Sequence, residues 1–316
     1  MVPQPPFDVL IVGGGPGGLS AALVCARQQR TVLLADHGEY RNAAAGEAHM
    51  LLGQDGVPPA RLRAAARDDL AHHDNVELRR AAVIDIRPAG DAFEAGFAGS
   101  RPVTVRRVIL ATGQEDVLPD VPGLAELFGH GLFHCPYCHG YEARGQAIGV
   151  LGAGYAHCAQ AAYLADRLSD DVVLCTNGDP VDPPDRAELD RRGIAVHPAP
   201  LTGVKGAPGD LRLTFADGTE LRRDALFHRT ATRQRSDLAE RLGCRFLPDG
   251  RVAVDAVGQT SVPGVYAVGD MARSESLPEA TAFVTTAAAD GLRAAVWVDQ
   301  ELLGMDADKA GASPAA

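Results

Sequence analysis

The sequence lacks an excess of basic residues. Its 316 residues carry 30 Lys and Arg against 41 Asp and Glu, which gives a formal net charge of −11. Nucleic acids and anionic lipid surfaces are bound through basic protein surfaces. The composition therefore argues against nucleic acid and against an anionic membrane surface as partners.

Long apolar runs and a leader segment are missing as well. No uninterrupted apolar stretch reaches the roughly 18 residues that indicate a transmembrane helix. Between Met1 and the first apolar run lies a short proline-rich lead with no basic segment and no cleavage site. We therefore expect a soluble, cytosolic (cytoplasmic) protein.

Cysteines are few, and only two of the six have the spacing of a motif. In a cytosolic chain, such a pattern is typical of a redox or metal-binding pair with scattered core thiols, and not of a disulfide framework. Free cysteine is among the most buried residue types. We therefore expect four cysteines to be core residues: Cys25, Cys158, Cys175 and Cys244.

Two segments share the order strand, glycine-rich turn, helix, and each has the pattern of a dinucleotide-binding domain. Their strands are Phe7 to Val12 and Ala147 to Leu151. The chain also exceeds the size at which one hydrophobic core keeps growing. We therefore predict an α/β fold with two Rossmann-like (three-layer) domains. A late strand at Val265 to Val268 and a helix from Thr281 to Leu303 are assigned to the first domain, and the last dozen residues are expected to be disordered.

The first glycine loop, Gly13 to Gly18, satisfies G-x-G-x-x-G between a strand and a helix, with Pro16 inside it. Gly13 permits the tight turn, Gly15 lets the backbone approach a pyrophosphate, and Gly18 lets helix and strand pack closely. Asp36, at the end of the next strand, can accept hydrogen bonds from a ribose. The loop predicts a dinucleotide site without deciding between FAD and NAD, and a glycine turn without a ligand is the alternative.

Gly269 and Asp270 follow the late strand and favour FAD, because a carboxylate at this place can bind a ribityl hydroxyl of the flavin. Alone, this pair of residues would be a weak signal. Together with the first glycine loop, it predicts FAD as the cofactor.

The segment His134-Cys135-Pro136-Tyr137-Cys138-His139-Gly140 has the highest density of reactive side chains. Two thiols at this spacing can close a disulfide at the start of a helix, where a nearby protonated histidine would lower a thiol pKa. One sulfur can then exchange with a substrate and the other with the flavin. His134 or His139 is predicted to act as an acid or base. The alternatives are a zinc half-site, which would crowd four ligands into six residues, and inert core thiols.

Over nearly its whole length the chain resembles the low-molecular-weight thioredoxin reductase family. The resemblance rests on both glycine units, the Cys-x-x-Cys pair, the run Ala111-Thr112-Gly113, and the run from Val262 to Asp270. It implies an FAD-binding domain in two segments, residues 1–118 and 246–316. It also implies an inserted NAD(P)H-type domain at residues 119–245 that carries the cysteines, and a homodimer.

The chain departs from that family at the second cysteine and at the second glycine loop. His139 stands where thioredoxin reductases have a proton-donating Asp. In the second loop, Gly152 and Gly154 are kept, but bulky His157 occupies the third glycine position. Asp179 follows the next strand, where the family has a basic His-Arg-Arg cluster for the NADPH 2′-phosphate. Without a guanidinium fork, binding of NADPH is disfavoured.

These departures are similar to those of the flavin dithiol oxidases that close disulfides in gliotoxin- and holomycin-type natural products. The likeness implies that a substrate dithiol reduces the pair, that Cys135 exchanges with substrate, that Cys138 faces FAD, and that O2 reoxidises the flavin. An NAD(P)H-dependent disulfide reductase and a flavin-based redox-sensing binding protein remain alternatives. The dithiol can belong to a small molecule or a small protein. Besides the glycine loop with Asp36, and Gly269 with Asp270, the implied cofactor-binding residues are Arg41, Asn42, His49, Asp55, Ala111, Thr112 and Gly113.

Overall fold

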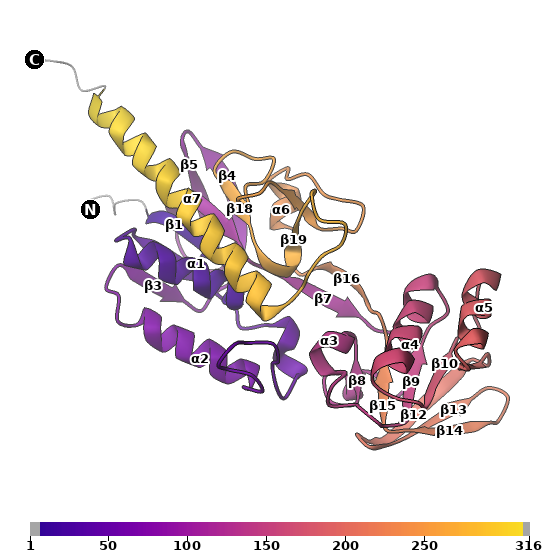
Figure 1. The fold of residues 1–316 in the computed structure, drawn as a ribbon. Helices are drawn as coiled ribbons and strands as arrows, with labels where there is room; N and C mark the ends of the chain where they lie inside the picture. Colours follow the sequence, from indigo (N-terminus) through magenta and orange to yellow (C-terminus); the bar gives the residue numbers. More distant parts are fainter. Residues whose placement is uncertain (1–6, 312–316) are drawn as a thin grey trace, which may run out of the picture. The chain divides into compact units, whose positions relative to one another are not determined.

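The computed structural model describes residues 7–311, and their side chains through residue 308. The chain divides into two compact units (Figure 1). Unit 1 comprises Met1–Arg41, Ala60–Glu115 and Thr232–Ala316, and unit 2 comprises Asn42–Pro59 and Asp116–Ala231.

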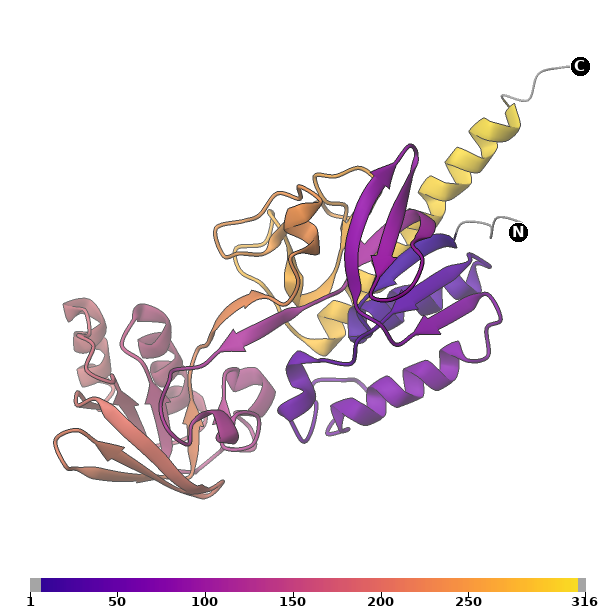
Figure 2. The ribbon, with the colours of Figure 1, turned by 180° about the vertical axis from the view of Figure 1, so that it is seen from behind.

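Unit 1 is built on a seven-stranded sheet with the order β3-β2-β1-β6-β5-β4, in which β18 also pairs with β6. Five strands are parallel: β1 (Phe7–Val12), β2 (Val32–Ala35), β3 (Val76–Arg79), β6 (Val103–Leu110) and β18 (Val265–Ala267). An antiparallel hairpin of β4 (Val83–Ala89) and β5 (Ala92–Phe97) joins the start of β6, and Figure 2 shows it from behind. The central strands are apolar on both sides, as buried parallel strands require.

Helices α1 (Pro16–Arg27) and α7 (Val284–Gly311) pack with each other against the sheet of unit 1, and Figures 1 and 2 show them side by side. Their backbones approach closely at two glycines, because a Cβ on Gly291 would lie 2.0 Å from the carbonyl oxygen of Gly17. A third helix, α2 (Pro59–Leu70), contributes the buried Leu70 to the same core.

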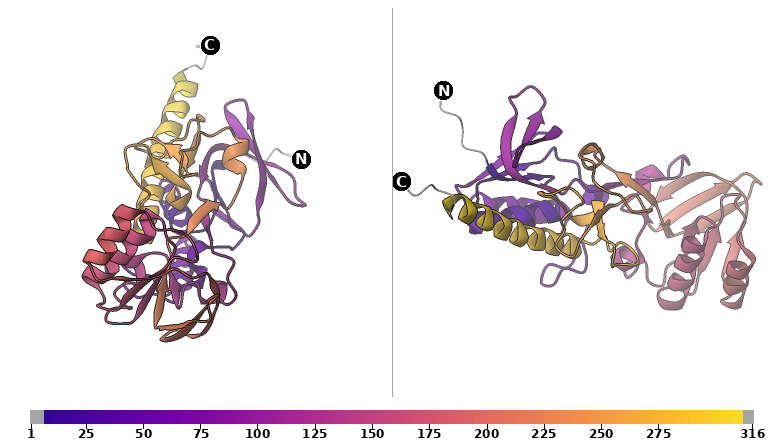
Figure 3. Two further views of the ribbon diagram at one scale, coloured as in Figure 1. Left: turned by 90° about the vertical axis from the view of Figure 1, so that its right-hand side faces the viewer. Right: turned by 90° about the horizontal axis from the view of Figure 1, so that it is seen from above.

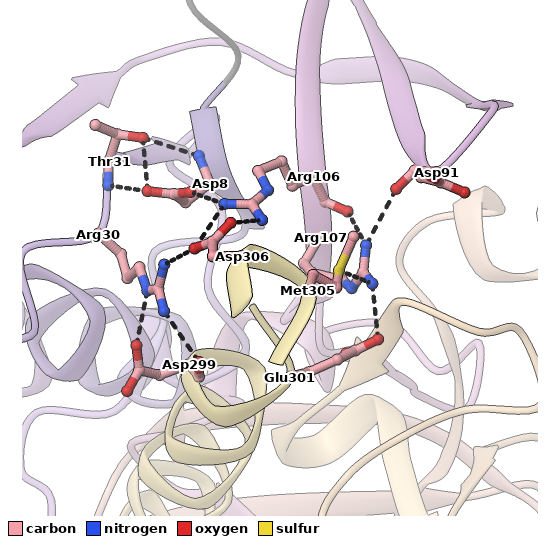
Figure 4. A network of polar contacts seen from close by, with 10 residues as sticks. All are labelled: Asp8, Arg30, Thr31, Asp91, Arg106, Arg107, Asp299, Glu301, Met305 and Asp306. Carbon is pink, nitrogen blue, oxygen red and sulfur yellow. Dashed lines mark hydrogen bonds and ion pairs between the residues drawn. The ribbon is translucent and has the colours of Figure 1, made fainter. Parts of the chain in front are cut away.

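The end of α7 corrects the expectation of a disordered tail, since the helix continues past Leu303 to Gly311. The reason is a set of ion pairs near its last turns (Figure 4). Asp306 pairs with Arg30 at 3.1 Å and with Arg106 at 2.5 Å, while Asp299 pairs with Arg30 at 2.7 Å. Residues 312–316 of the predicted tail lie outside the described residues.

Unit 2 has three layers, which Figure 3 shows most clearly in its right-hand view. Its parallel sheet has the order β11-β10-β9-β15-β8, and a separate antiparallel sheet has the order β12-β13-β14. The parallel strands are β8 (Leu132–Phe133), β9 (Ile148–Leu151), β10 (Val172–Cys175), β11 (Ala195–His197) and β15 (Ala225–Phe227). The other sheet contains β12 (Leu201–Ala207), β13 (Asp210–Phe215) and β14 (Glu220–Arg223), and the helices are α4 (Tyr155–Arg167) and α5 (Pro183–Arg191).

Alternate residues of β10 serve the two cores of unit 2. Val172 and Leu174 belong to the cluster that includes residues of α4 and α5, whereas Val173 and Cys175 belong to the cluster with the β12–β14 sheet. This is the two-residue period of a strand buried on both faces. Cys175, like Cys25, Cys158 and Cys244, is a buried free thiol, which confirms the expectation for these four residues.

The chain passes between the units at β7 (Gln114–Val117) and β16 (Ala231–Gln234), which pair with each other. These crossings lie near residues 115 and 231, whereas the predicted domain boundaries lie at 118 and 245. The later segment belongs to unit 1 because Leu238, Ala239 and Cys244 are buried in its core. Residues 42–59, assigned to the first domain, group instead with unit 2.

No helix among residues 7–311 combines the length and apolar character needed to cross a membrane.

Candidate active site

The first glycine loop of unit 1 lies where the carboxyl ends of three strands meet. Val12 is in register with Leu110, and Leu110 with Ala267, so the residues that follow each strand share one edge of the sheet. In open α/β sheets, ligands bind outside the carboxyl ends of the strands. Gly13, Ala111 and Gly269 therefore lie at or close to the edge expected to bind the cofactor.

The three motif glycines have different surroundings. Gly13 has a φ of +112°, and a Cβ there would lie 2.3 Å from the carbonyl oxygen of Ala111. A Cβ on Gly18 would lie 1.9 Å from the carbonyl oxygen of Gly13, so this glycine lets the helix pack on the turn. Around Gly15, by contrast, a Cβ would meet nothing within 4 Å. This open backbone at the start of the 12-residue α1 fits a pyrophosphate.

Asp36 directly follows β2 and lies in a cluster of polar partners that the sequence did not indicate. Its Oδ2 accepts hydrogen bonds from the Tyr40 hydroxyl at 2.5 Å and from Arg67 at 2.7 Å. Arg63 lies 4.0 Å above the Tyr40 ring. Burial opposes ionisation of Asp36, but the hydrogen bonds from Tyr40, Arg67 and nearby backbone amides outweigh it and lower its pKa. Asp36 is thus an ionised acceptor, and Arg63 and Arg67, four residues apart on α2, are the signal that was missed.

Asp270 is held by Arg41, a residue singled out from the resemblance. The Arg41 guanidinium lies 2.9 Å from Asp270 Oδ2, and Arg251 donates to the Asp270 carbonyl at 3.1 Å. Thr112, from the run after β6, donates to the sulfur of Met271 at 3.2 Å. Unit 1 therefore brings these predicted residues to the edge of the sheet that carries the glycine loop.

Cys135 and Cys138 form a disulfide in unit 2, with 5.3 Å between their Cα atoms. Cys135 caps the single-turn helix α3 (Pro136–His139), and its sulfur accepts a hydrogen bond from the Cys138 amide at 3.1 Å. Gly140 ends the turn where a Cβ would lie 2.2 Å from the Pro136 carbonyl oxygen. The pair thus lies at the start of a helix and is closed as a disulfide.

His139 is the better placed of the two flanking histidines to act as a base. Its ring stacks on Phe133, with centroids 4.6 Å apart, and its Nε2 is buried without a hydrogen-bond partner among residues 7–311. Burial lowers the pKa of His139, and the neighbouring His49 lowers it further. The imidazole is therefore neutral near pH 7 and able to accept a proton. His134 stacks on Phe128 at 6.0 Å, and its carbonyl accepts from Gln160 at 3.0 Å.

The second glycine loop is filled by a side chain of the protein. The ring of His157 lies so close over Gly152 that a Cβ there would be 2.5 Å from His157 Cδ2. His157 also stacks on His228, with centroids 5.0 Å apart, and His228 Nδ1 lies 2.8 Å from the Leu151 carbonyl oxygen. Burial lowers the pKa of both histidines. The neutral His157 ring therefore lies over the backbone that a dinucleotide would need to approach, with the neutral His228 ring stacked on it.

No basic cluster replaces the missing one beyond β10. Arg186, the first arginine after this strand, lies on α5 and pairs with Asp190 at 2.9 Å. The turn that follows β10 contains Asn177, whose side chain accepts from the Leu201 amide at 2.7 Å. The first arginine after β10 is thus paired on α5, and the side chain of the turn itself is an amide.

His49 and Asp55 lie in unit 2, beside the redox pair. The His49 ring is edge-on to His139, with centroids 6.1 Å apart and planes at 90°. His49 Nδ1 lies 3.5 Å from Asp55 Oδ2. Asn42 also belongs to unit 2, whereas the other predicted cofactor-binding residues belong to unit 1. The contact of these three residues with a flavin stays a prediction, and the closeness of His49 to His139 is a feature that the sequence did not indicate.

The family model for pyridine nucleotide-disulphide oxidoreductases matches residues 7–291. A protein named thioredoxin reductase tcpT, from Claviceps purpurea, is 38% identical over 283 residues, covering 83% of this chain and 86% of that protein. Thioredoxin reductase aclD, from Aspergillus oryzae, is 34% identical and covers 84% and 88%. The crystal structure of HlmI superposes with a TM-score of 0.90 at 36% identity, covering 98% of this chain and 96% of that one.

Proposed function

This chain belongs to the pyridine nucleotide-disulphide oxidoreductase family, and from that premise we propose that it is a dithiol oxidase dependent on FAD. The family membership makes it a flavin-dependent disulfide oxidoreductase of the thioredoxin reductase-like kind. The proposal adds the direction of electron flow, in which a substrate dithiol is the donor and O2 is the acceptor.

One observation carries the direction, namely the imidazole of His157 over Gly152. A nicotinamide dinucleotide would need that backbone for its pyrophosphate. The stacked His228 holds the ring in place, and no arginine fork follows β10 to attract a 2′-phosphate. A filled nicotinamide site supports entry of the electrons from the other substrate of the redox pair, which is a dithiol.

The residues of unit 2 supply the thiol chemistry. We propose that neutral His139 takes the proton of one substrate thiol, and that the thiolate attacks Cys135, releasing Cys138 as a thiolate. The second substrate thiol gives its proton to the Cys138 thiolate and attacks the substrate sulfur of the mixed disulfide, which releases Cys135 to take the first proton back from His139. The substrate gains its disulfide, and the two enzyme cysteines have received two electrons and two protons. FAD, when bound, would supply the two-electron acceptor for this pair and the chemistry by which O2 is reduced to H2O2.

The residues that we propose to hold FAD are those that meet at the sheet edge of unit 1. The open backbone at Gly15 fits the pyrophosphate, the ionised Asp36 fits a ribose, and Asp270, oriented by Arg41, fits the ribityl chain. The Ala111–Gly113 turn completes the proposed set in unit 1, while a contact of Asn42, His49 and Asp55 with the flavin stays what the resemblance implies.

The proposal is tested by mixing the oxidised holoenzyme anaerobically with NADPH, with NADH and with a small dithiol, while the flavin absorbance is followed. Of the three reductants, we expect only the dithiol to bleach the flavin. O2 should then restore the colour and yield H2O2. Rapid bleaching by either nicotinamide would contradict the proposal and support the second candidate, an NAD(P)H-dependent disulfide reductase. That candidate is favoured by the names of the relatives, which read thioredoxin reductase.

Replacing Cys138 with Ser tests the route through the disulfide. FAD binding should be unchanged, because the cysteine is not among the proposed FAD-binding residues of unit 1. Bleaching by a dithiol should fall to the background rate, since a single thiol cannot pass on an electron pair. Bleaching of C138S at the wild-type rate would show that the flavin receives electrons without the Cys pair. Bound FAD with no turnover of any dithiol in the wild-type protein would instead favour the redox-sensing binding protein.

A further inference from the structure

The loop that carries His49 is tightly constrained by the chain itself. Ala48 pairs with Val57 in an antiparallel bridge, and Asp55 Oδ1 accepts the Met50 amide at 2.6 Å. Met50 has a φ of +64°, a backbone conformation that is energetically unfavourable for residues other than glycine. Such strain persists where the surroundings impose it, and it is frequent at functional sites. The strained residue directly follows His49.

His49 is mostly buried among carboxylates. Its side chain is 13% exposed, and three acidic oxygens lie 3.5 Å from its ring nitrogens: one from Asp55 at Nδ1, and one each from Glu47 and Glu142 at Nε2. Glu142 belongs to the turn that follows the redox helix α3, so this contact ties the His49 loop to the Cys-x-x-Cys segment. The His49 ring also makes the edge-on contact with His139, with ring centroids 6.1 Å apart.

We propose that His49 is a positioning residue, which fixes the ring of His139 and controls the charge state in which His139 meets a substrate thiol. Phe133 fixes one face of the His139 ring, and His49 adds the perpendicular contact. Asp55 orients His49 in turn through Nδ1. The inference rests on the proposed role of His139 as the base.

The charged groups that face His139 act in opposite directions. Burial lowers the pKa of His139 most, His49 lowers it further, and Glu142 and Glu47 raise it. Asp55 faces His49 from the same loop. Removing His49 therefore leaves the two glutamates unopposed and should raise the pKa of His139. Removing the charge of Glu142 should lower it. If His49 only filled space beside His139, removing His49 would leave the pKa of His139 unchanged.

The first experiment is an NMR titration of the His139 Cε1–H signal in the oxidised holoenzyme, with the signal assigned by its loss in His139→Gln. For H49Q we expect the midpoint to rise by about half a pH unit. This is the shift that corresponds to the Coulomb energy between two unit charges ~6 Å apart in water. For E142Q we expect it to fall. His72→Gln replaces an exposed histidine of unit 1 and should leave the midpoint unchanged. An unchanged midpoint in H49Q, or a shift of both variants in one direction, would overturn the proposal.

The second experiment follows anaerobic flavin reduction by a dithiol against pH, with His49→Phe added to the set. Phenylalanine keeps an aromatic edge beside His139 but has no nitrogen to carry charge. We expect the rate to reach half its maximum at a higher pH in H49F and H49Q than in the wild type. This shift has the same direction as that of the NMR midpoint. A wild-type profile in H49F would reduce His49 to a packing role and refute the proposal. Since the NMR readout needs no turnover, it holds even if nicotinamides prove to be the donors, and the two failures can be told apart.

Discussion

His157 stands in the first turn of α4, where a dinucleotide-binding loop needs a small residue so that backbone and ligand can approach. Its imidazole lies over Gly152, whose φ of +120° keeps the tight turn of the motif. The glycines thus preserve the shape of the loop while one side chain fills the space that this shape would provide. Because burial and the neighbouring His228 lower the pKa of His157, the two stacked rings are neutral near pH 7 and do not repel each other.

Replacing His157 with Ala should reopen the second glycine loop. We expect NADH to reduce the flavin of H157A slowly but measurably, while NADPH stays the weaker donor because no arginine fork binds its 2′-phosphate. Anaerobic absorbance changes with each nicotinamide measure this. Y155A serves as the matched control, since it truncates an exposed side chain in the same first turn of α4 and keeps both stacked rings. Equal inertness of H157A and wild type toward NADH would show that His157 is not what keeps the dinucleotide out.

At the scale of elements, α7 is long because its apolar stripe packs in the core and its last turns form ion pairs. Its apolar stripe, with Ala294, Val298 and Leu302, is fully buried against the sheet and α1. Beyond that stripe, the helix is held by ion pairs to Arg30 and Arg106, whose side chains are only 13% and 15% exposed (Figure 4). Ion pairs with one well-packed partner contribute more than fully exposed ones, which are worth about 0–1 kcal/mol.

Asp306→Ala should loosen the last turns of α7 without unfolding unit 1. We expect a loss of about 1 kcal/mol in the free energy of unfolding, because two guanidinium groups lose one shared partner. Hydrogen exchange should accelerate in residues 304–311 and not in α1. Asp308→Ala is the matched control, because this exposed aspartate lies two residues further along the same helix. Equal hydrogen-exchange rates in the two variants would show that the ion pairs of Asp306 are not what extends the helix.

The same elements show how far sequence reasoning reaches. The buried strands that precede the two glycine turns, and the turns themselves, were predictable, because buried strands are apolar runs and glycine marks the turns that follow them. The β4–β5 hairpin and the β12–β14 sheet were not, since their strands are half-exposed and carry charged side chains on the outer face. The closeness of His49 to His139 was equally hidden, because these histidines are 90 positions apart in the numbering and no local pattern links them.

At the scale of the whole molecule, the outer face of α7 bears apolar side chains that the described residues leave exposed. Leu292, Trp297 and Leu303 are 50%, 50% and 56% exposed, and Val296 is 43% exposed. A helix with apolar residues outside its own core contact has a surface suited to a partner. The homodimer implied by the resemblance would cover this face, since an isologous interface places the same patch on both subunits.

We therefore expect a particle of about twice the 33.1 kDa chain mass in sedimentation equilibrium. Leu292→Glu combined with Val296→Glu should reduce it to the monomer mass, because two charges on each subunit would have to be buried without a counter-ion. Trp297 is the only tryptophan of the chain, so its emission reports this face directly and should shift to longer wavelength in the double variant. Leu52→Glu is the control, as Leu52 is an exposed apolar residue of unit 2. A monomer in the wild type, or a dimer in the double variant, would show that α7 does not form the interface.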